Sequence, residues 1–277
     1  VRLLDKTGNV VFLPFDLTVP FARICARSGH MRLKRFDIAD VYRENLLAGG
    51  QPRAVLAASY DIISQEPDPS AEAEVLALMY ELLQMPGLAG EAWNVELSHE
   101  SILRVFLQRF PAQFHSALLE ALPQYLARGS DARVRHLLGS TGMPVSLLDE
   151  VDAWNIYEDF DTAVHTLAEL LTPEERTKLA EPLAHLVSVV RLAREFSVQS
   201  KIYLVPLFSH SHTHYRNGTM MAVSKMSSGG KHRDVLAVGG RYDELLRRFS
   251  YPRIGSSQEP RHGVGLQIAV GKMVKAV

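Results

Sequence analysis

Cysteine is almost absent from this chain, since Cys25 is the only one among 277 residues. A single cysteine excludes an internal disulfide and is typical of a reducing compartment. Because Cys25 lies in an apolar helical stretch, we expect a buried thiol without a chemical role. Long apolar runs are missing as well: no segment reaches the roughly 18 residues of a membrane span, and no signal-peptide pattern occurs. We therefore expect a cytoplasmic protein that does not contact a membrane.

An excess of charge of either sign is also absent, because 30 Lys and Arg stand against 31 Asp and Glu. Contact with a nucleic acid would need a local basic patch rather than a global field. Apolar residues make up 47% of the chain, which is enough to build a substantial core and argues against wholesale disorder. The chain begins without methionine, in the middle of a strand pattern, so we expect a segment of a longer protein.

The first part of the chain has the pattern of strands and hairpins. Residues 1–15 predict a hairpin whose turn is Asp5-Lys6-Thr7-Gly8-Asn9. A short helix follows, which Asp16 can cap. Residues 33–43 and 54–63 alternate as strands, and the loop between them contains Gly49-Gly50. A loop of this length favours an antiparallel pair over a βαβ unit.

The rest of the chain alternates between helical and strand patterns. A helix is predicted over 70–85 and a strand over 93–97. Residues 100–196 are helical in pattern, with a capping box at Thr172-Pro173-Glu174-Glu175. Strand patterns return at 201–208, 215–224, 234–238 and 265–270, with helices over 242–249 and from 271 onward. These patterns predict an α+β fold with a largely antiparallel sheet flanked by helices. We divide it into a core of 1–99 and 197–277 and an all-helical insertion of 100–196.

Three segments resemble the catalytic core of class II aminoacyl-tRNA synthetases, specifically the histidyl enzyme. Residues 13–23, Leu-Pro-Phe-Asp-Leu-Thr-Val-Pro-Phe-Ala-Arg, are similar to the loop of that family that binds the amine of the substrate. Residues 36–63, with Val-Tyr-Arg-Glu at 41–44, resemble the second class II motif. Residues 237–245, Ala-Val-Gly-Gly-Arg-Tyr-Asp-Glu-Leu, match a histidyl signature loop. Their order and spacing cover the chain apart from the helical block, and the resemblance implies the class II fold.

The departures from the family pattern lie at the positions that carry catalysis. The family's Arg-Glu-Phe-x-Gln is Arg53-Ala54-Val55-Leu56-Ala57 here, so Ala54 and Ala57 replace two polar side chains. Ser211 stands at the place of the catalytic arginine, and Lys272 at the place of the arginine that pairs with ATP. A lost carboxamide costs roughly 1–3 kcal/mol of ligand binding. A lost preorganised cation costs roughly 3–4 kcal/mol in the transition state. The resemblance therefore implies a domain without aminoacylation activity.

Other positions keep the family pattern, as Asp16, Arg43 and Tyr215 do. We define a remnant substrate pocket that consists of Asp16, Arg43, Arg53, Tyr215, Gly239, Gly240, Arg241 and Tyr242. The Gly239-Gly240 pair is open to two interpretations, a cradle for a phosphate group or a strand-to-helix turn that needs a permissive backbone. We expect no cofactor and no metal ion.

Similarly degenerate domains occur in the general-control kinases, which phosphorylate the alpha subunit of translation initiation factor 2. The shared segments include Leu-Pro-Phe-Asp-Leu, Pro-Phe-Ala-Arg and Gly-Gly-Arg-Tyr-Asp. This resemblance implies a regulatory domain that follows a protein kinase domain, senses uncharged tRNA during amino-acid starvation and acts through a homodimer. Two alternatives stay open: an active histidyl-tRNA synthetase from a divergent lineage, and a purely structural module for dimerisation or docking.

Two groups of side chains allow further hypotheses. His210, His212 and His214 alternate, so on a strand they would share one face and could bind zinc; a diverged substrate strand is the alternative. Basic residues on two predicted hairpins could contact RNA, or could simply form solvated surfaces. The possible RNA contacts are Arg32, Lys34, Arg35, Lys231 and Arg233.

Overall fold

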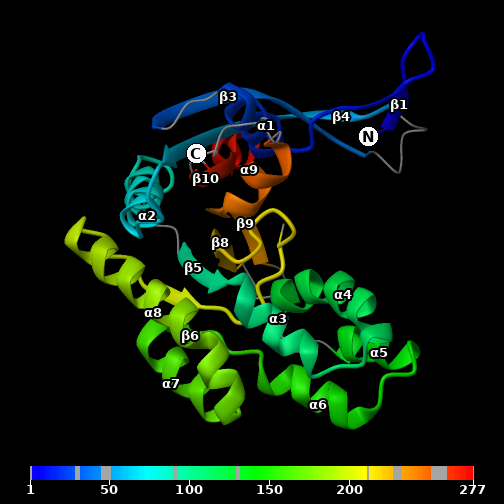
Figure 1. Cartoon of the computed structure of the whole chain (residues 1–277). Coiled ribbons are helices and arrows are strands. Elements are labelled where there is room, and N and C mark those ends of the chain that lie inside the picture. The colour runs from blue at the N-terminus through cyan, green and yellow to red at the C-terminus, as the bar shows by residue number, and fades with distance from the viewer. Residues whose placement is uncertain are drawn as a thin grey trace, which may run out of the picture.

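An eight-stranded mixed sheet forms the centre of the computed structural model (Figure 1), which describes residues 2–28, 32–44, 51–89, 93–128, 132–210, 212–226, 233–250 and 261–276. The strand order is β3-β4-β10-β9-β8-β5-β7-β6, and every neighbouring pair is antiparallel except β5 and β7. The strands are β3 (Leu33–Arg43), β4 (Arg53–Ser64), β5 (Asn94–His99), β6 (Glu158–Asp159), β7 (Ile202–Leu204), β8 (Thr219–Met226), β9 (Arg233–Arg241) and β10 (His262–Ala269). A separate hairpin pairs β1 (Arg2–Leu4) with β2 (Val10–Phe12).

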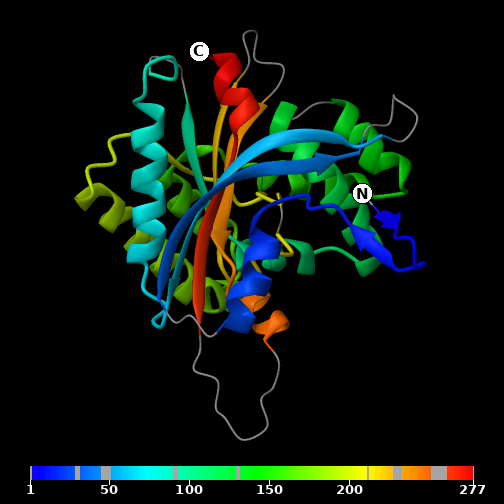
Figure 2. The same ribbon diagram turned by 90° about the horizontal axis from the view of Figure 1, so that it is seen from above.

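Helices cover both faces of this sheet (Figure 2). They are α1 (Thr18–Ser28), α2 (Ser70–Leu83), α3 (Glu100–Gln108), α4 (His115–Arg128), α5 (Ala132–Ser140), α6 (Val145–Ala153), α7 (Phe160–Leu170), α8 (Pro173–Glu195), α9 (Asp243–Phe249) and α10 (Val270–Ala276), with a 3-10 turn η1 (Ala112–Phe114). Helices α1 and α9 pack together and against β10, whereas α2 packs between β10 and α8. The class II synthetase-like α+β architecture predicted from the sequence is confirmed by this arrangement and by the structural comparisons below.

The pleat of β4 directs successive side chains to opposite faces. The Tyr60 hydroxyl donates to Glu74 of α2 at 2.8 Å. The next residue, Asp61, instead accepts hydrogen bonds from Tyr242 and Arg35. Because side chains alternate along a strand, the face that carries Asp61 is the one opposite α2. The predicted antiparallel pair is confirmed, with Arg43 opposite Arg53 and Leu33 opposite Ile63.

Side-chain caps fix the starts of two helices. Asp16 accepts from the backbone N–H of Val19 at 2.9 Å, which satisfies a free donor at the start of α1. At the start of α8 the predicted capping box is present, because Glu175 accepts from the Thr172 N–H and the Thr172 hydroxyl accepts from the Glu175 N–H.

The helical block differs from the prediction in one respect: it is not entirely helical. Glu158 and Asp159 form β6, which pairs with β7 and extends the sheet. One continuous hydrophobic core joins the block to the rest of the chain and includes the fully buried Trp154. The division into 1–99 with 197–277 and 100–196 stays a prediction. No helix in the described part of the chain is long and apolar enough to cross a bilayer.

Candidate functional site

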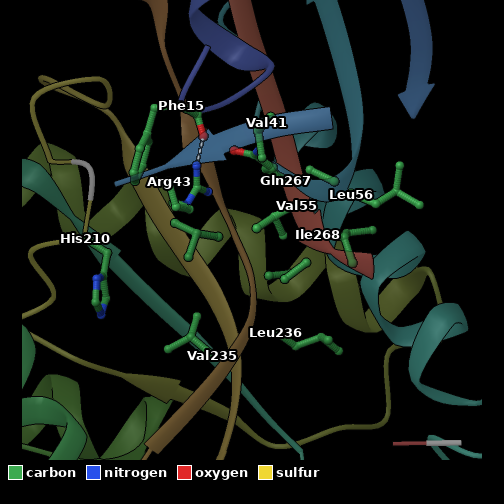
Figure 3. A pocket seen from close by; sticks show the side chains of 14 residues that line it. Phe15, Val41, Arg43, Val55, Leu56, His210, Val235, Leu236, Gln267 and Ile268 are labelled. Atoms are coloured by element: carbon green, nitrogen blue, oxygen red, sulfur yellow. Dashed lines mark hydrogen bonds between the residues drawn. The ribbon is translucent and has the colours of Figure 1, made fainter. Parts of the chain in front are cut away.

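A cavity of about 280 Å³ opens on the sheet where β3, β4, β9 and β10 meet Phe15 (Figure 3). Its lining residues are Phe15, Val41, Arg43, Val55, Leu56, Ala57, His210, Val235, Leu236, Ala237, Val238, Gln267, Ile268 and Ala269. Three of these 14 carry polar side chains, namely Arg43, His210 and Gln267. Ala57 is buried here, so the structure brings one of the predicted losses together with Arg43 in a largely apolar cavity.

The Arg43 guanidinium interacts with the chain itself. It donates to the carbonyl oxygen of Phe15 and lies over the Phe15 ring, 3.7 Å from the centroid (Figure 3). Burial lowers the pKa of Arg43, and the nearby Asp16 carboxylate partly opposes this. A ligand that uses Nη1 of Arg43 must therefore compete with the carbonyl oxygen of Phe15.

Asp16 and Tyr215 lie close together, although neither is among the residues that line the cavity. Besides capping α1, Asp16 lies 3.5 Å from Nδ1 of His214. Tyr215 is buried, and burial together with the charges of Asp16 and Asp61 raises its pKa well above the ordinary value. The buried phenol is thus kept neutral.

Asp61 is the residue of this face that sequence reasoning missed. Its side chain is fully buried, accepts from the Tyr242 hydroxyl at 3.0 Å and pairs with Nε of Arg35 at 3.3 Å. The Arg35 guanidinium lies over the Phe21 ring at 3.7 Å. Burial raises the pKa of Asp61 to about 6, against the lowering effect of Arg35. A carboxylate inside the apolar run 60–63 was the signal in the sequence, because such a group is rarely buried without partners.

This pKa gives a pH prediction for Asp61→Asn. Folding favours the protonated carboxyl of Asp61. The contribution of this protonation to the free energy of unfolding is therefore complete below the ordinary pKa of 3.8 and is lost as the pH rises through about 6. The free energy of unfolding of the wild type, relative to Asp61→Asn, should fall by roughly 2–3 kcal/mol between about pH 4 and about pH 7. Urea denaturation over this range measures it. Asp40→Asn, on an exposed part of β3, is the control. If the free energies of unfolding of the wild type and Asp61→Asn differ by the same amount at every pH, the raised pKa of Asp61 is contradicted.

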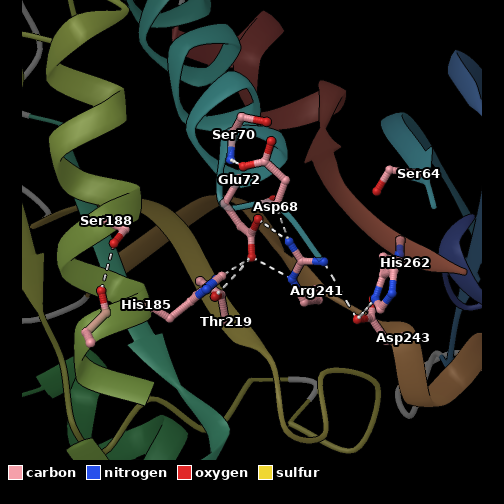
Figure 4. A network of polar contacts seen from close by, with 12 residues as sticks. Ser64, Asp68, Ser70, Glu72, His185, Ser188, Thr219, Arg241, Asp243 and His262 are labelled. Carbon is pink, nitrogen blue, oxygen red and sulfur yellow. Dashed lines mark hydrogen bonds and ion pairs between the residues drawn. The ribbon is translucent and has the colours of Figure 1, made fainter. Parts of the chain in front are cut away.

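Arg241 and Tyr242 do not share a site, although both belong to the predicted pocket. The Tyr242 hydroxyl reaches Asp61, whereas Arg241 pairs with Glu72 of α2 through Nε at 2.7 Å and through Nη2 (Figure 4). Glu72 also accepts from Nε2 of His185 at 2.9 Å. Arg241 thus lies on the α2 side of the sheet and Tyr242 on the other side, because consecutive residues leaving a strand reach opposite faces; a role of Arg241 in substrate binding stays a prediction.

Gly239 and Gly240 lie within β9, so their interpretation as a turn after the strand was wrong. A Cβ at Gly239 would lie 2.3 Å from the carbonyl oxygen of Gly265 on the neighbouring strand. A Cβ at Gly240 would lie 2.1 Å from the carbonyl oxygen of Thr219 and 2.9 Å from the Tyr215 ring. Both glycines are needed for close packing; the phosphate cradle stays a prediction.

The remaining positions of predicted loss, and Arg53 of the remnant pocket, are not among the residues that line the cavity or lie outside the described residues. Ala54 and Arg53 are exposed on β4 and are not among the residues that line the cavity. The Lys272 amine donates to Asp234 at 2.5 Å and to the carbonyl of Val235 at 2.9 Å, at the edge of β9. Ser211 lies outside the described residues.

The predicted RNA-contacting cations do not form one surface. Arg32 and Lys34 are exposed, and Lys34 pairs with Glu74. Arg35 faces the other side of β3 and contacts Asp61, and the Arg233 side chain is buried against Glu96. Lys231 lies outside the described residues.

The premise of the zinc hypothesis was wrong, because the described residues between β7 and β8 form turns and bends rather than a strand. His210 lines the cavity, His214 lies beside Asp16, and Nδ1 of His212 lies 3.1 Å from the carbonyl of Ser209. The three rings therefore have separate environments. Among the residues whose positions are described, no group of three metal-ligating side chains converges.

The comparison with protein families identifies the chain. The family described as histidyl-tRNA synthetase matches residues 1–265. The chain belongs to the histidyl-tRNA synthetase family. The family's fold is also seen in solved structures: a histidyl-tRNA synthetase from Nostoc sp. PCC 7120 matches with a TM-score of 0.73 and 19% identity over 99% of this chain and 61% of that one.

Curated relatives of this family member include eIF-2-alpha kinase GCN2 from Schizosaccharomyces pombe, 27% identical over 279 residues, and its counterpart from Rattus norvegicus, 28% identical over 290. Each match covers 99% of this chain and 17% of the kinase, so the chain spans about a sixth of the length of these relatives. The ATP phosphoribosyltransferase regulatory subunit of Geobacillus thermodenitrificans is 26% identical over all of this chain and 66% of its own length.

Proposed function

We propose that this chain is a catalytically inactive histidyl-tRNA synthetase-like regulatory domain of a cytoplasmic Ser/Thr kinase that phosphorylates the alpha subunit of translation initiation factor 2. In this role it senses uncharged tRNA during amino-acid starvation and controls the adjacent kinase domain, in a homodimer of the full-length protein. The observation that carries the proposal is the apolar cavity around Ala57, which retains Arg43 but little else that could hold a charged substrate.

The chemistry of the cavity supports inactivity. Val55, Ala57, Val235 and Ala269 offer no hydrogen bonds from their side chains to a nucleotide. Among the described residues that line the cavity, Arg43 alone carries a fixed charge, so a triphosphate brought into this cavity would leave most of its charge unpaired. Unpaired charge in an apolar site is strongly unfavourable. The relation to GCN2 kinases over 99% of the chain supports the regulatory role.

Binding of deacylated tRNA tests the sensing role. We expect saturable binding that weakens as salt increases, because phosphate contacts release counterions. The double variant Arg32→Glu and Lys34→Glu should lower the affinity for tRNA by about tenfold, since both side chains are exposed. It should also reduce the slope of the logarithm of the binding constant against the logarithm of the salt concentration by about two. Fluorescence anisotropy with labelled tRNA measures both quantities.

Arg247→Glu is the matched control, because Arg247 is an exposed cation on α9. It should bind tRNA as the wild type does. No binding of deacylated tRNA at low salt would contradict the sensing role and favour a docking module.

A second candidate role rests on the similarity to the ATP phosphoribosyltransferase regulatory subunit. A chain with this role would stimulate a catalytic ATP phosphoribosyltransferase on mixing and would not need tRNA. Stimulation without tRNA binding would favour this candidate over the kinase role.

A further inference from the structure

A second cavity, of about 480 Å³, lies between the core and α8, on the α2 side of the sheet. Figure 4 shows part of its wall, where His185 of α8 and Arg241 of β9 meet at Glu72. An apolar cavity of about 150 Å³ accommodates a benzene molecule, so this one has room for a small organic molecule. Unlike the cavity around Ala57, its lining is mainly polar and includes residues from both the core and the helical block.

The carboxylates at the base of this cavity already have partners. Glu72 accepts from Arg241, from His185 and, at 3.3 Å, from the Thr219 hydroxyl. Asp243 lies 2.7 Å from Nδ1 of His262 and accepts from the N–H of Gly263 at 2.9 Å. Both carboxylates therefore already have hydrogen-bond donors within the protein.

Two side chains at the base, Arg241 and His99, have N–H groups that a ligand can use. Arg241 is 5% exposed, and its Nη1 is buried without a hydrogen bond; the nearest carboxylate oxygen, of Asp243, is 3.6 Å away. The Nδ1 of His99 accepts from the N–H of Ser101 at 3.1 Å. Burial, with the charges of His185 and Arg104, lowers the pKa of His99 to about 4, so the ring is neutral and carries its proton on Nε2. His99 lines the cavity and thus offers an N–H donor there.

Cations from two different elements stand at the rim. Arg104 of α3 donates to the side-chain amide oxygen of Asn217 at 2.6 Å and to the Ser101 hydroxyl at 2.9 Å, and it lies 3.4 Å from the Glu100 carboxylate. Lys178 of α8 is half-exposed, and its pairing with Glu174 is a surface ion pair of the kind that is easily exchanged. The exposed Glu181 also lines the cavity and disfavours a second anionic group on a ligand.

We propose that this cavity binds a small molecule through a single oxyanion group, a phosphate or a carboxylate, which contacts Arg241, His99, Arg104 and Lys178. A buried guanidinium nitrogen that makes no hydrogen bond, although it lies 3.6 Å from Asp243, and a neutral imidazole donor are suited to such oxygens, which form strong charge-assisted hydrogen bonds. Because Lys178 belongs to α8 and the other three to the core and α3, a bound ligand fixes α8 against the sheet. The site is independent of whether the chain lacks synthetase activity.

Titration calorimetry of the 277-residue chain with inorganic phosphate or acetate, at ionic strength held constant with NaCl, tests this site. We expect saturable binding of at least one of the two with a stoichiometry of one. Arg104→Met and Lys178→Met, both at partly exposed positions, should each weaken it by about tenfold, and Arg247→Met on α9 should leave it unchanged. If acetate binds at least as tightly as phosphate, the ligand is assigned as a carboxylate. If phosphate binds and acetate does not, it is assigned as a phosphate ester.

Hydrogen exchange of α8 locates the effect independently of affinity. Saturating anion should slow the exchange of backbone amides in 173–195 in the wild type and in Arg247→Met, and should slow it less at the same concentration in Lys178→Met. Circular dichroism establishes that each variant is folded. Binding that is non-saturable, or that is equal in the wild type and in both rim variants, would overturn the proposal.

Discussion

Replacement of Glu72 by alanine should lower the free energy of unfolding by roughly 3–5 kcal/mol, because it leaves a buried cation without its partner. Glu72 is fully buried and accepts hydrogen bonds from three donors, on Arg241, His185 and Thr219. Arg241 is itself buried, so its charge cannot regain water when the carboxylate is removed. Urea denaturation followed by circular dichroism measures the loss.

Glu74→Ala is the matched control on the same helix. The Glu74 side chain is 36% exposed, pairs with Lys34 at the surface and accepts a hydrogen bond from Tyr60. Surface pairs of this kind contribute about 1 kcal/mol or less. Equal, small losses for Glu72→Ala and Glu74→Ala would show that the network around Arg241 does not hold α2 and α8 to the sheet.

The parts of the fold that the sequence predicted correctly are those with strong local patterns. The alternation of 33–43 and 54–63 predicted β3 and β4, and Thr172-Pro173-Glu174-Glu175 predicted the start of α8. The two-residue strand β6 has no pattern of its own, since it exists through pairing with β7. The packing of α8 against α2 depends on contacts between distant segments, such as His185 with Glu72, which local periodicity does not encode.

The candidate site was predicted in part, for a similar reason. Family motifs brought Asp16, Arg43 and Tyr215 to attention, and the structure places all three on or next to the face opposite α2. The same motif suggested that Arg241 and Tyr242 act together, but the pleat separates them. Asp61 was not predicted as a site residue, because its partners, Arg35 and Tyr242, lie 26 and 181 residues away along the chain.

ATP–pyrophosphate exchange with histidine tests most directly the claim that this domain does not activate an amino acid. We predict exchange no faster than without protein, under conditions in which an active histidyl-tRNA synthetase turns over. Ala57→Gln alone should not restore it, because the family resemblance implies that Ser211 stands in place of the catalytic arginine, a loss that costs about 10²–10³ in rate. Histidine-dependent exchange well above background, abolished when Ala57→Leu fills the cavity, would contradict the account.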